Sequence, residues 1–132
     1  MSDNTDNRVA RQEQIATHPL PAGRVEFLCS LEGHLPALDA TAALTYIPYK
    51  NVLSAEDFTA YLKDLPAPED RATAMEALAA IILDDLNNEL VPRWLQLVLT
   101  RYNTDGTVQR VLVEDKQPRW DNKTLLRRAQ GI

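Results

Sequence analysis

Hydrophobic and polar residues change their spacing along the chain, and each spacing is typical of one kind of element. In residues 24–29, RVEFLC, the side chains of Val25, Phe27 and Cys29 fall on one side of an alternating pattern, which predicts a half-buried strand. The following EGHLPALDA contains glycine, proline and aspartate, which interrupt that strand. Residues 41–48, TAALTYIP, are apolar and β-branched until a proline ends them, so they predict a second strand.

Two helices are predicted between residues 54 and 90. The segment SAEDFTAYLKDLP opens with Ser54, and Asp57 follows three residues later in a start that resembles a capping box. The apolar residues of this segment share one helical face. A longer helix is predicted after PAP, because its first residues are acidic and apolar residues recur at spacings of three and four from Met75 to Leu90.

Two further strands are predicted after the helices. Residues 92–102, PRWLQLVLTRY, place a leucine at every second position, and TVQRVLVE alternates again a few residues later. The sequence NTDG between them suits the tight turn of a hairpin. The order of elements is therefore ββααββ, which predicts an α+β fold with an antiparallel sheet and two helices on one face.

The two ends of the chain lack this periodicity. Residues 1–21 are polar and predict a mobile N-terminal tail. A single domain is expected over residues 22–120, since one hydrophobic core commonly forms from about 100 to 150 residues. Residues 121–132 form a C-terminal extension, and its basic LLRR is either a last helical turn or loose surface chain.

Composition and charge weigh against several classes of partner. The net charge is -5 and the isoelectric point is near 5.0, so the field of the chain opposes nucleic-acid phosphates and anionic lipids. Apolar runs such as ALAAIIL fall short of the roughly 20 residues of a membrane span, and the first residues lack a secretory signal's apolar core. The single cysteine cannot form an internal disulfide, and two histidines with one cysteine show no metal-ligand spacing. We therefore expect a cytoplasmic protein without a metal site.

Four segments are similar to successive segments of one enzyme family. VEFLC, TYIPYKNVLSAEDFTAYL, EALAAIILDDLNNELVPRWLQL and DKQPRW resemble the 7-cyano-7-deazaguanine reductase family, the nitrile reductases of queuosine biosynthesis. ILDDL, together with the PRWL that follows it, is the most specific match, and the resemblance covers residues 24–120. It implies the tunnelling fold (T-fold), which is shared with GTP cyclohydrolase I. Units of that fold join sheet edge to sheet edge into homo-oligomeric barrels, with sites between protomers.

The chemistry that this resemblance implies is the reduction of a nitrile. In the family, a cysteine thiolate adds to the nitrile to form a thioimide, and NADPH then delivers hydride twice. A carboxylate fixes the purine-like ring by accepting two hydrogen bonds. Counting back from ILDDL places the family's glutamate at Glu76, so the resemblance makes Glu76 the substrate-binding residue. The pattern alone is also that of an exposed helix glutamate.

The family's nucleophile motif, Cys-Pro-x-Thr-Gly-x-Pro-Asp, is not matched. The corresponding loop reads SLEGHLPALD and is several residues shorter. Cys29 corresponds most naturally to a second cysteine at the end of a strand in the family, and its place in the alternation predicts a buried thiol with a raised pKa. The other interpretation is that the shortened loop brings Cys29 to the pocket as nucleophile, with His34 or Asp39 as proton donor.

The positions of the family's cofactor contacts are altered as well. The Val-Glu-x-Lys-Ser run before the first helix is VLSAEDF here, which leaves Ser54 as either a cofactor contact or a helix N-cap. The family's Asn-x-Arg-Gly-Gly hairpin has become NTDGT, where Asp105 would repel an NADPH phosphate.

Framework segments are therefore kept while the functional motifs are changed, which indicates changed or absent chemistry. We expect a divergent family member that binds a purine- or pterin-like heterocycle at a subunit interface, with NADPH as cofactor only if the family activity is retained. The alternative is a non-catalytic oligomeric assembly or interaction protein that retains only the scaffold.

Overall fold

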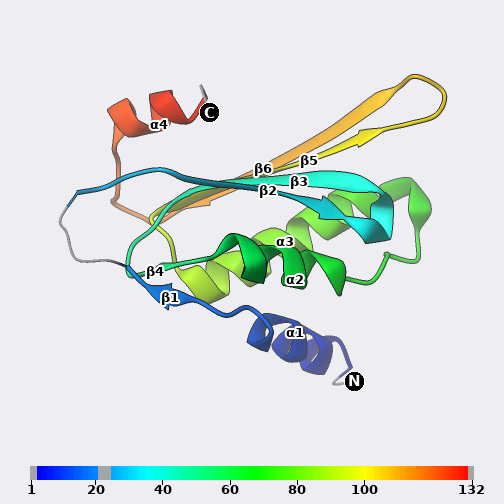
Figure 1. Cartoon of the computed structure of the whole chain (residues 1–132), viewed down its shortest axis with the longest axis horizontal. Coiled ribbons are helices and arrows are strands. Elements are labelled where there is room, and N and C mark those ends of the chain that lie inside the picture. The colour runs from blue at the N-terminus through cyan, green and yellow to red at the C-terminus, as the bar shows by residue number, and fades with distance from the viewer. Residues whose placement is uncertain (1–2, 21–24, 131–132) are drawn as a thin grey trace.

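The computed structural model describes residues 3–20 and 25–130, and a four-stranded antiparallel sheet forms its centre (Figure 1). The strands lie in the order β2-β3-β5-β6. Their bounds are β2 Cys29–Leu35, β3 Ala40–Ile47, β5 Trp94–Tyr102 and β6 Val108–Lys116. Each strand is antiparallel to its neighbour, so the two edge strands, β2 and β6, also run antiparallel to each other.

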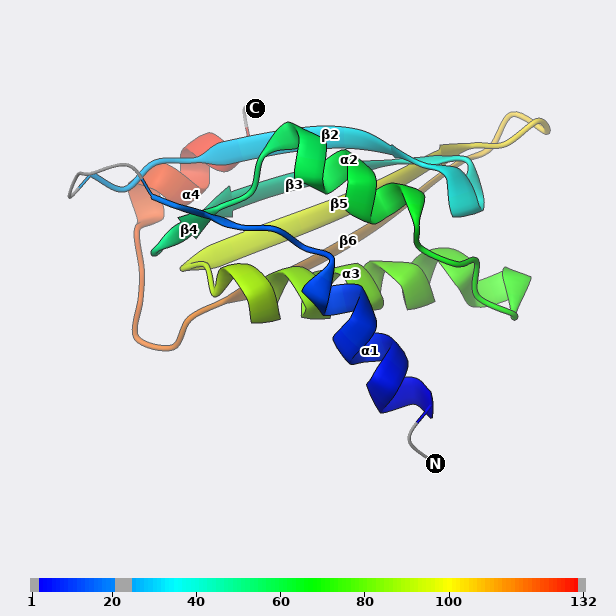
Figure 2. The ribbon, with the colours of Figure 1, turned by 60° about the horizontal axis from the view of Figure 1, so that its bottom comes forward.

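Helices cover one face of this sheet. In Figure 1, α2 (Ala55–Lys63) and α3 (Ala74–Leu90) lie below it, while the short α4 (Lys123–Ala129) lies above it. Figure 2 shows α1 (Asp3–Glu13) crossing over α3. A second, two-stranded pairing joins β1 (His18–Pro19) to β4 (Asn51–Val52). The prediction of an α+β fold with an antiparallel sheet and two helices on one face is confirmed.

The hydrophobic core lies between the sheet and the α2–α3 layer. Every second residue of β3 and β5 faces the helices and is buried, as the alternation predicts for a sheet covered on one side. The largest fully buried side chains include Tyr46, Leu44, Phe58, Leu78 and Ile82. At Gly33 in β2 a Cβ atom would approach Leu62 of α2 to 3.0 Å, so the missing side chain allows this helix to lie close.

The predicted helix boundaries are confirmed at the start of α2. The Ser54 hydroxyl accepts a hydrogen bond from the Asp57 amide at 3.1 Å and donates one to the Asp57 carboxylate at 2.7 Å. Before α3, the Asp70 carboxylate caps the 3₁₀ turn Arg71–Thr73 by accepting from the Ala72 amide. Helix α2 and the 3₁₀ turn before α3 therefore begin at side chains that satisfy otherwise unpaired amides, whereas the N-cap of α3, Thr73, makes no side-chain hydrogen bond.

The first predicted strand was placed too early. Arg24 lies outside the described residues, and residues 25–28 form no strand; Val25 is 77% exposed. The register explains this, since Cys29 pairs with Tyr46 and β3 ends one residue later, before Pro48, which has no amide proton to donate. The expected interruption at Gly33 was also wrong, because β2 continues to Leu35.

The N-terminal segment does contain regular structure, contrary to the expectation for residues 1–21. Its helix α1 contacts the core mainly through polar groups. Hydrophobic periodicity indicates a helix only when the helix has an apolar stripe, so it did not predict α1. Ile15, just after α1, is buried in the core cluster. At the other end, the open alternative for LLRR resolves as the helix α4, which Asn122 caps.

Candidate functional site

A pocket lies at the end of the sheet where β2 turns into β3. Its walls are the 3₁₀ turn Pro36–Leu38, the connection between α2 and α3, the first residue of α3 and the end of β5. Its volume is about 360 Å³. Prolines, alanines and one leucine make up the apolar part of the lining, and the polar part consists of Asp39, Arg71 and Arg101. We call this the sheet-end pocket.

Asp39, one of the two predicted proton donors, lines this pocket, and the other, His34, lies near Asp39 but does not line it. Asp39 ends the 3₁₀ turn in the left-handed conformation, with φ of 49°, and its carboxylate is 92% exposed. The His34 Nε2 atom lies 3.8 Å from Asp39 Oδ1, too far for a hydrogen bond. The pair can attract through charge when the imidazole is protonated, and water screens that attraction.

Arg71 and Arg101 supply the positive charge of the pocket. Arg101 continues the inward-facing positions of β5 after Leu95, Leu97 and Leu99, and it is half-buried. Neither guanidinium forms a hydrogen bond or an ion pair with another residue in the described part of the chain. Both were missed at the sequence level, although extending the leucine alternation by one step points to an arginine on the covered face.

Glu76 lies beside this pocket, in the first turn of α3. Its carboxylate is exposed and accepts a long hydrogen bond, 3.3 Å, from Gln109 Nε2 on β6. Gln109 is the register partner of Arg101 across the β5–β6 ladder, so Glu76, Gln109 and Arg101 are neighbours at one end of the sheet. A carboxylate at a helix N-terminus is favourably placed in the field of the helix.

Cys29 lies at the end of β2 that is farther from the sheet-end pocket. It is six positions from Leu35, which corresponds to about 20 Å along a strand. The thiol is half-buried against the core, and burial raises its pKa, an effect that the neighbouring Tyr46 hydroxyl partly offsets. Within one chain, Cys29 therefore shares no site with His34 or Asp39.

Cys29 is also separated from Glu76. Across the sheet it is level with Tyr46, Leu95 and Asp115, whereas the partner of Glu76, Gln109, lies six residues away from Asp115 on β6. Cys29 therefore lies at one end of the edge strand β2, whereas Glu76 lies beside the other edge strand, β6, at the opposite end of the sheet. The sequence alone could not predict this, because it depends on the register of all four strands.

The positions expected to contact NADPH do not fit that cofactor. The Ser54 hydroxyl is occupied by its two hydrogen bonds to Asp57, whose carboxylate also contacts His18 Nε2 at 2.8 Å. In the β5–β6 turn, the Asp105 carboxylate accepts from both the amide and the hydroxyl of Thr107, and these bonds hold the pKa of Asp105 below its usual value. The turn presents a negative charge where a phosphate would need a positive one.

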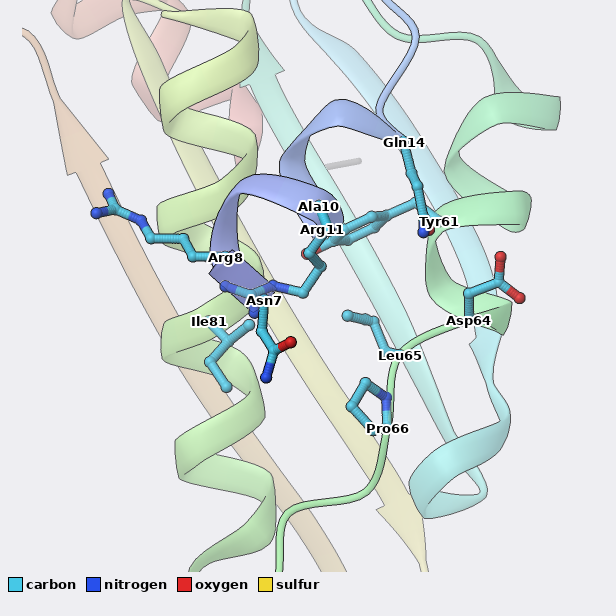
Figure 3. A pocket seen from close by; sticks show the side chains of 10 residues that line it. All are labelled: Asn7, Arg8, Ala10, Arg11, Gln14, Tyr61, Asp64, Leu65, Pro66 and Ile81. Atoms are coloured by element: carbon cyan, nitrogen blue, oxygen red, sulfur yellow. The ribbon is translucent and has the colours of Figure 1, made fainter. Parts of the chain in front are cut away.

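A second cleft lies between α1, the end of α2 and the middle of α3, with a volume of about 630 Å³ (Figure 3). Both of its arginines are occupied by ion pairs. Arg8 pairs with Asp84 at 2.9 Å and Arg11 with Asp85 at 2.6 Å. The Tyr61 hydroxyl also donates to Asp85, and burial raises the pKa of Tyr61 strongly. This cleft is where α1 attaches, and Arg11, Tyr61 and Asp85 satisfy one another there.

Two classes of feature are absent from the described residues. No cluster of three or more histidine, cysteine, aspartate or glutamate side chains there is arranged to hold a metal ion. Among the helices of residues 3–20 and 25–130, none combines the length and the apolar character needed to cross a bilayer.

Comparison with known proteins finds relatives of one kind. No family model matches the chain. Two curated proteins do, both described as NADPH-dependent 7-cyano-7-deazaguanine reductase, from two strains of Acidithiobacillus ferrooxidans. Each is 32% identical over 99 residues, which cover 75% of this chain and 67% of the relative.

Proposed function

The chain belongs to the NADPH-dependent 7-cyano-7-deazaguanine reductase family, and we propose that it binds a purine- or pterin-like heterocycle through Glu76 at a subunit interface, without reducing a nitrile. The observation that carries this proposal is the state of Glu76. Its carboxylate is exposed, and its hydrogen bonding within the described residues is limited to the long contact from Gln109. Acceptor capacity remains for the ring N–H and amine groups of a guanine-type edge.

The two open edges of the sheet support the subunit interface. The edge strands β2 and β6 run antiparallel to each other, so copies related by a rotation can pair β6 of one with β2 of the next in an unbroken antiparallel sheet. The register places Arg110 of β6 level with His34 of β2. If the copies pair without a stagger, Glu76 of one copy lies level with the His34–Asp39 turn of the next. Such a closed ring is the tunnelling-fold arrangement.

The chemistry required for nitrile reduction has no support in this chain. A nucleophilic cysteine needs a lowered thiol pKa, and burial raises that of Cys29. The cofactor-contact positions, Ser54 and the Asp105 turn, do not fit NADPH. We therefore propose that the family scaffold and its heterocycle carboxylate remain while the redox step is lost, and that the protein acts in the cytoplasm.

Isothermal titration of the full chain with guanine, 7-deazaguanine and pterin tests this function. We expect one of these ligands to bind and Glu76→Ala to abolish the binding. Glu56→Ala is the matched control, because Glu56 is an exposed glutamate in the first turn of α2. Absence of binding, or binding that Glu76→Ala leaves unchanged, would contradict the proposal.

A non-catalytic assembly protein is the second candidate function. It is favoured by the separation of Cys29 from His34 and Asp39, which leaves no catalytic group assembled within one chain. Sedimentation velocity distinguishes the two. A ring that binds none of the three heterocycles supports the assembly protein, whereas a monomer contradicts both functions. NADPH oxidation that depends on the nitrile substrate and is lost in Cys29→Ala would restore the reductase.

A further inference from the structure

We propose that the sheet-end pocket binds the phosphate of a phosphorylated heterocycle through Arg71 and Arg101, while Glu76 holds the ring. This inference rests on the proposed function for the ring and adds the chemical class of the ligand. The pocket and the two arginines are features of this chain's own structure.

The state of Arg101 is the first argument. The other arginines of the described chain are either exposed or paired. Arg11 pairs with Asp85, and Arg93 pairs with Glu26 and lies over the ring of Tyr49. Arg101 is half-buried, on the face of the sheet that the helices cover. Its guanidinium has no hydrogen-bond or ion-pair partner among the described residues. A guanidinium that is partly removed from water without a counter-charge is costly, and an anionic ligand would compensate it.

The second argument is convergence within a cavity of suitable size. Arg71, from the 3₁₀ turn before α3, and Arg101, from the end of β5, line the same pocket of about 360 Å³. Two guanidinium groups can each donate paired hydrogen bonds to phosphate oxygens. The volume falls within the range of small-molecule pockets.

The third argument is the distance to Glu76. Arg101 and Gln109 are register partners, whose Cβ atoms lie about 5 Å apart in an antiparallel pair, and Gln109 touches Glu76. The carboxylate for the ring therefore lies beside β6, and Arg101 lies on the neighbouring strand β5. This spacing suits the ring and the phosphate of one mononucleotide.

One charge in the pocket opposes the phosphate. Asp39 lines the rim, but its carboxylate is 92% exposed, so water screens its repulsion. Replacing Asp39 with asparagine removes only this screened repulsion and should therefore strengthen GMP binding by no more than a few-fold.

Titration of the full chain with GMP and with guanosine tests the inference. We expect GMP to bind at least about tenfold more tightly than guanosine, the effect of one charge-assisted contact. The double variant Arg71→Gln/Arg101→Gln should reduce the affinity for GMP to that for guanosine without changing the affinity for guanosine. Arg127→Gln/Arg128→Gln, at two exposed arginines of α4, is the matched control and should keep the preference. Circular dichroism melting of each variant checks that it folds.

The outcomes separate this inference from the function on which it rests. Equal binding of GMP and guanosine, or a preference that survives in Arg71→Gln/Arg101→Gln, overturns the phosphate site and leaves the role of Glu76 intact. Loss of guanosine binding in Glu76→Gln supports the ring site alone. If guanosine does not bind the wild type, inorganic pyrophosphate becomes the probe. Its binding to wild type but not to the double variant supports the arginine pocket, and its failure to bind overturns it.

Discussion

The guanidinium of Arg11 in α1 holds the carboxylate of Asp85 in α3 by two hydrogen bonds, of 2.6 and 3.0 Å, across 74 residues of sequence. The Asp85 side chain is 0% exposed, and Gln12 Nε2 and the Tyr61 hydroxyl donate to the same carboxylate. A buried carboxylate with four donors is compensated, so α1 is attached to the core by charge and hydrogen bonds.

Replacing Arg11 with alanine should therefore destabilise the protein strongly. The change leaves Asp85 buried without its counter-charge, which costs about 3 kcal/mol in the free energy of unfolding. Arg8→Ala is a matched control, because Arg8 pairs with Asp84 on the same two helices while both side chains are about half exposed, and such pairs contribute less than about 1 kcal/mol. Urea denaturation measures both, and equal losses would contradict the argument.

The elements that depend on local spacing could be predicted from the sequence, and those that depend on partners could not. The alternation around Leu97 and the cap at Ser54 are local, and both are confirmed. The failure at Val25 arose because β3 ends at Ile47 and leaves no partner for that position. Helix α1 escaped detection because Asp85, the residue that attaches it, lies in another element.

The candidate site shows the same division. Glu76 was predicted from the resemblance to a family and Asp39 from its place in the shortened loop, but their relation to the pocket required the fold. Arg101 carries a signal in the alternation of β5, since it occupies an inward-facing position. The separation of Cys29 from Glu76 is a property of four strands in register.

Ser54→Ala should destabilise α2 and leave ligand binding unchanged. The hydroxyl satisfies the Asp57 amide, and loss of such a cap costs about 1 kcal/mol. Thr59→Ala in the same helix is the control, because its exposed hydroxyl bonds only to the Ala55 carbonyl one turn earlier and alanine is the better helix former. Thermal melting measures both variants. A Ser54→Ala protein as stable as the wild type but with weakened ligand binding would make Ser54 a ligand contact.

Stability in acid should depend on Asp57. Its hydrogen bond to His18, and then that to Ser54, hold the pKa of Asp57 below its ordinary value of 3.8. A carboxylate with a lowered pKa in the folded state contributes stability above its unfolded pKa, and that contribution is lost as the pH falls through the folded value. Asp57→Asn should therefore lower stability at pH 6, and its difference from wild type should shrink as the pH falls below the ordinary value of 3.8.

Urea midpoints at pH 6, 4 and 3 measure this dependence. Asp64→Asn is the control, because the Asp64 carboxylate has no hydrogen bond or ion pair with the other described residues. It should follow the wild type at each pH. A constant difference between Asp57→Asn and wild type at all three values would contradict the role of Asp57.

Cys29 should react slowly with alkylating reagents. Burial raises the pKa of its thiol, so less thiolate is present near pH 8 than in the unfolded chain, and the half-buried sulfur is less accessible. Iodoacetamide labelling of the folded protein should be slower than labelling in urea, after correction with free cysteine in the same buffers. Faster labelling of the folded protein would indicate an activated nucleophile and would favour the reductase.

A crystal structure of the full chain grown with guanine tests the central claim most directly. We predict a closed ring in which guanine lies at the junction of β6 and the neighbouring copy's β2, with both carboxylate oxygens of Glu76 accepting hydrogen bonds of about 2.9 Å from the ring N–H and amine. Guanine bound away from Glu76, or a Glu76 carboxylate facing solvent in a ring without guanine, would contradict the account.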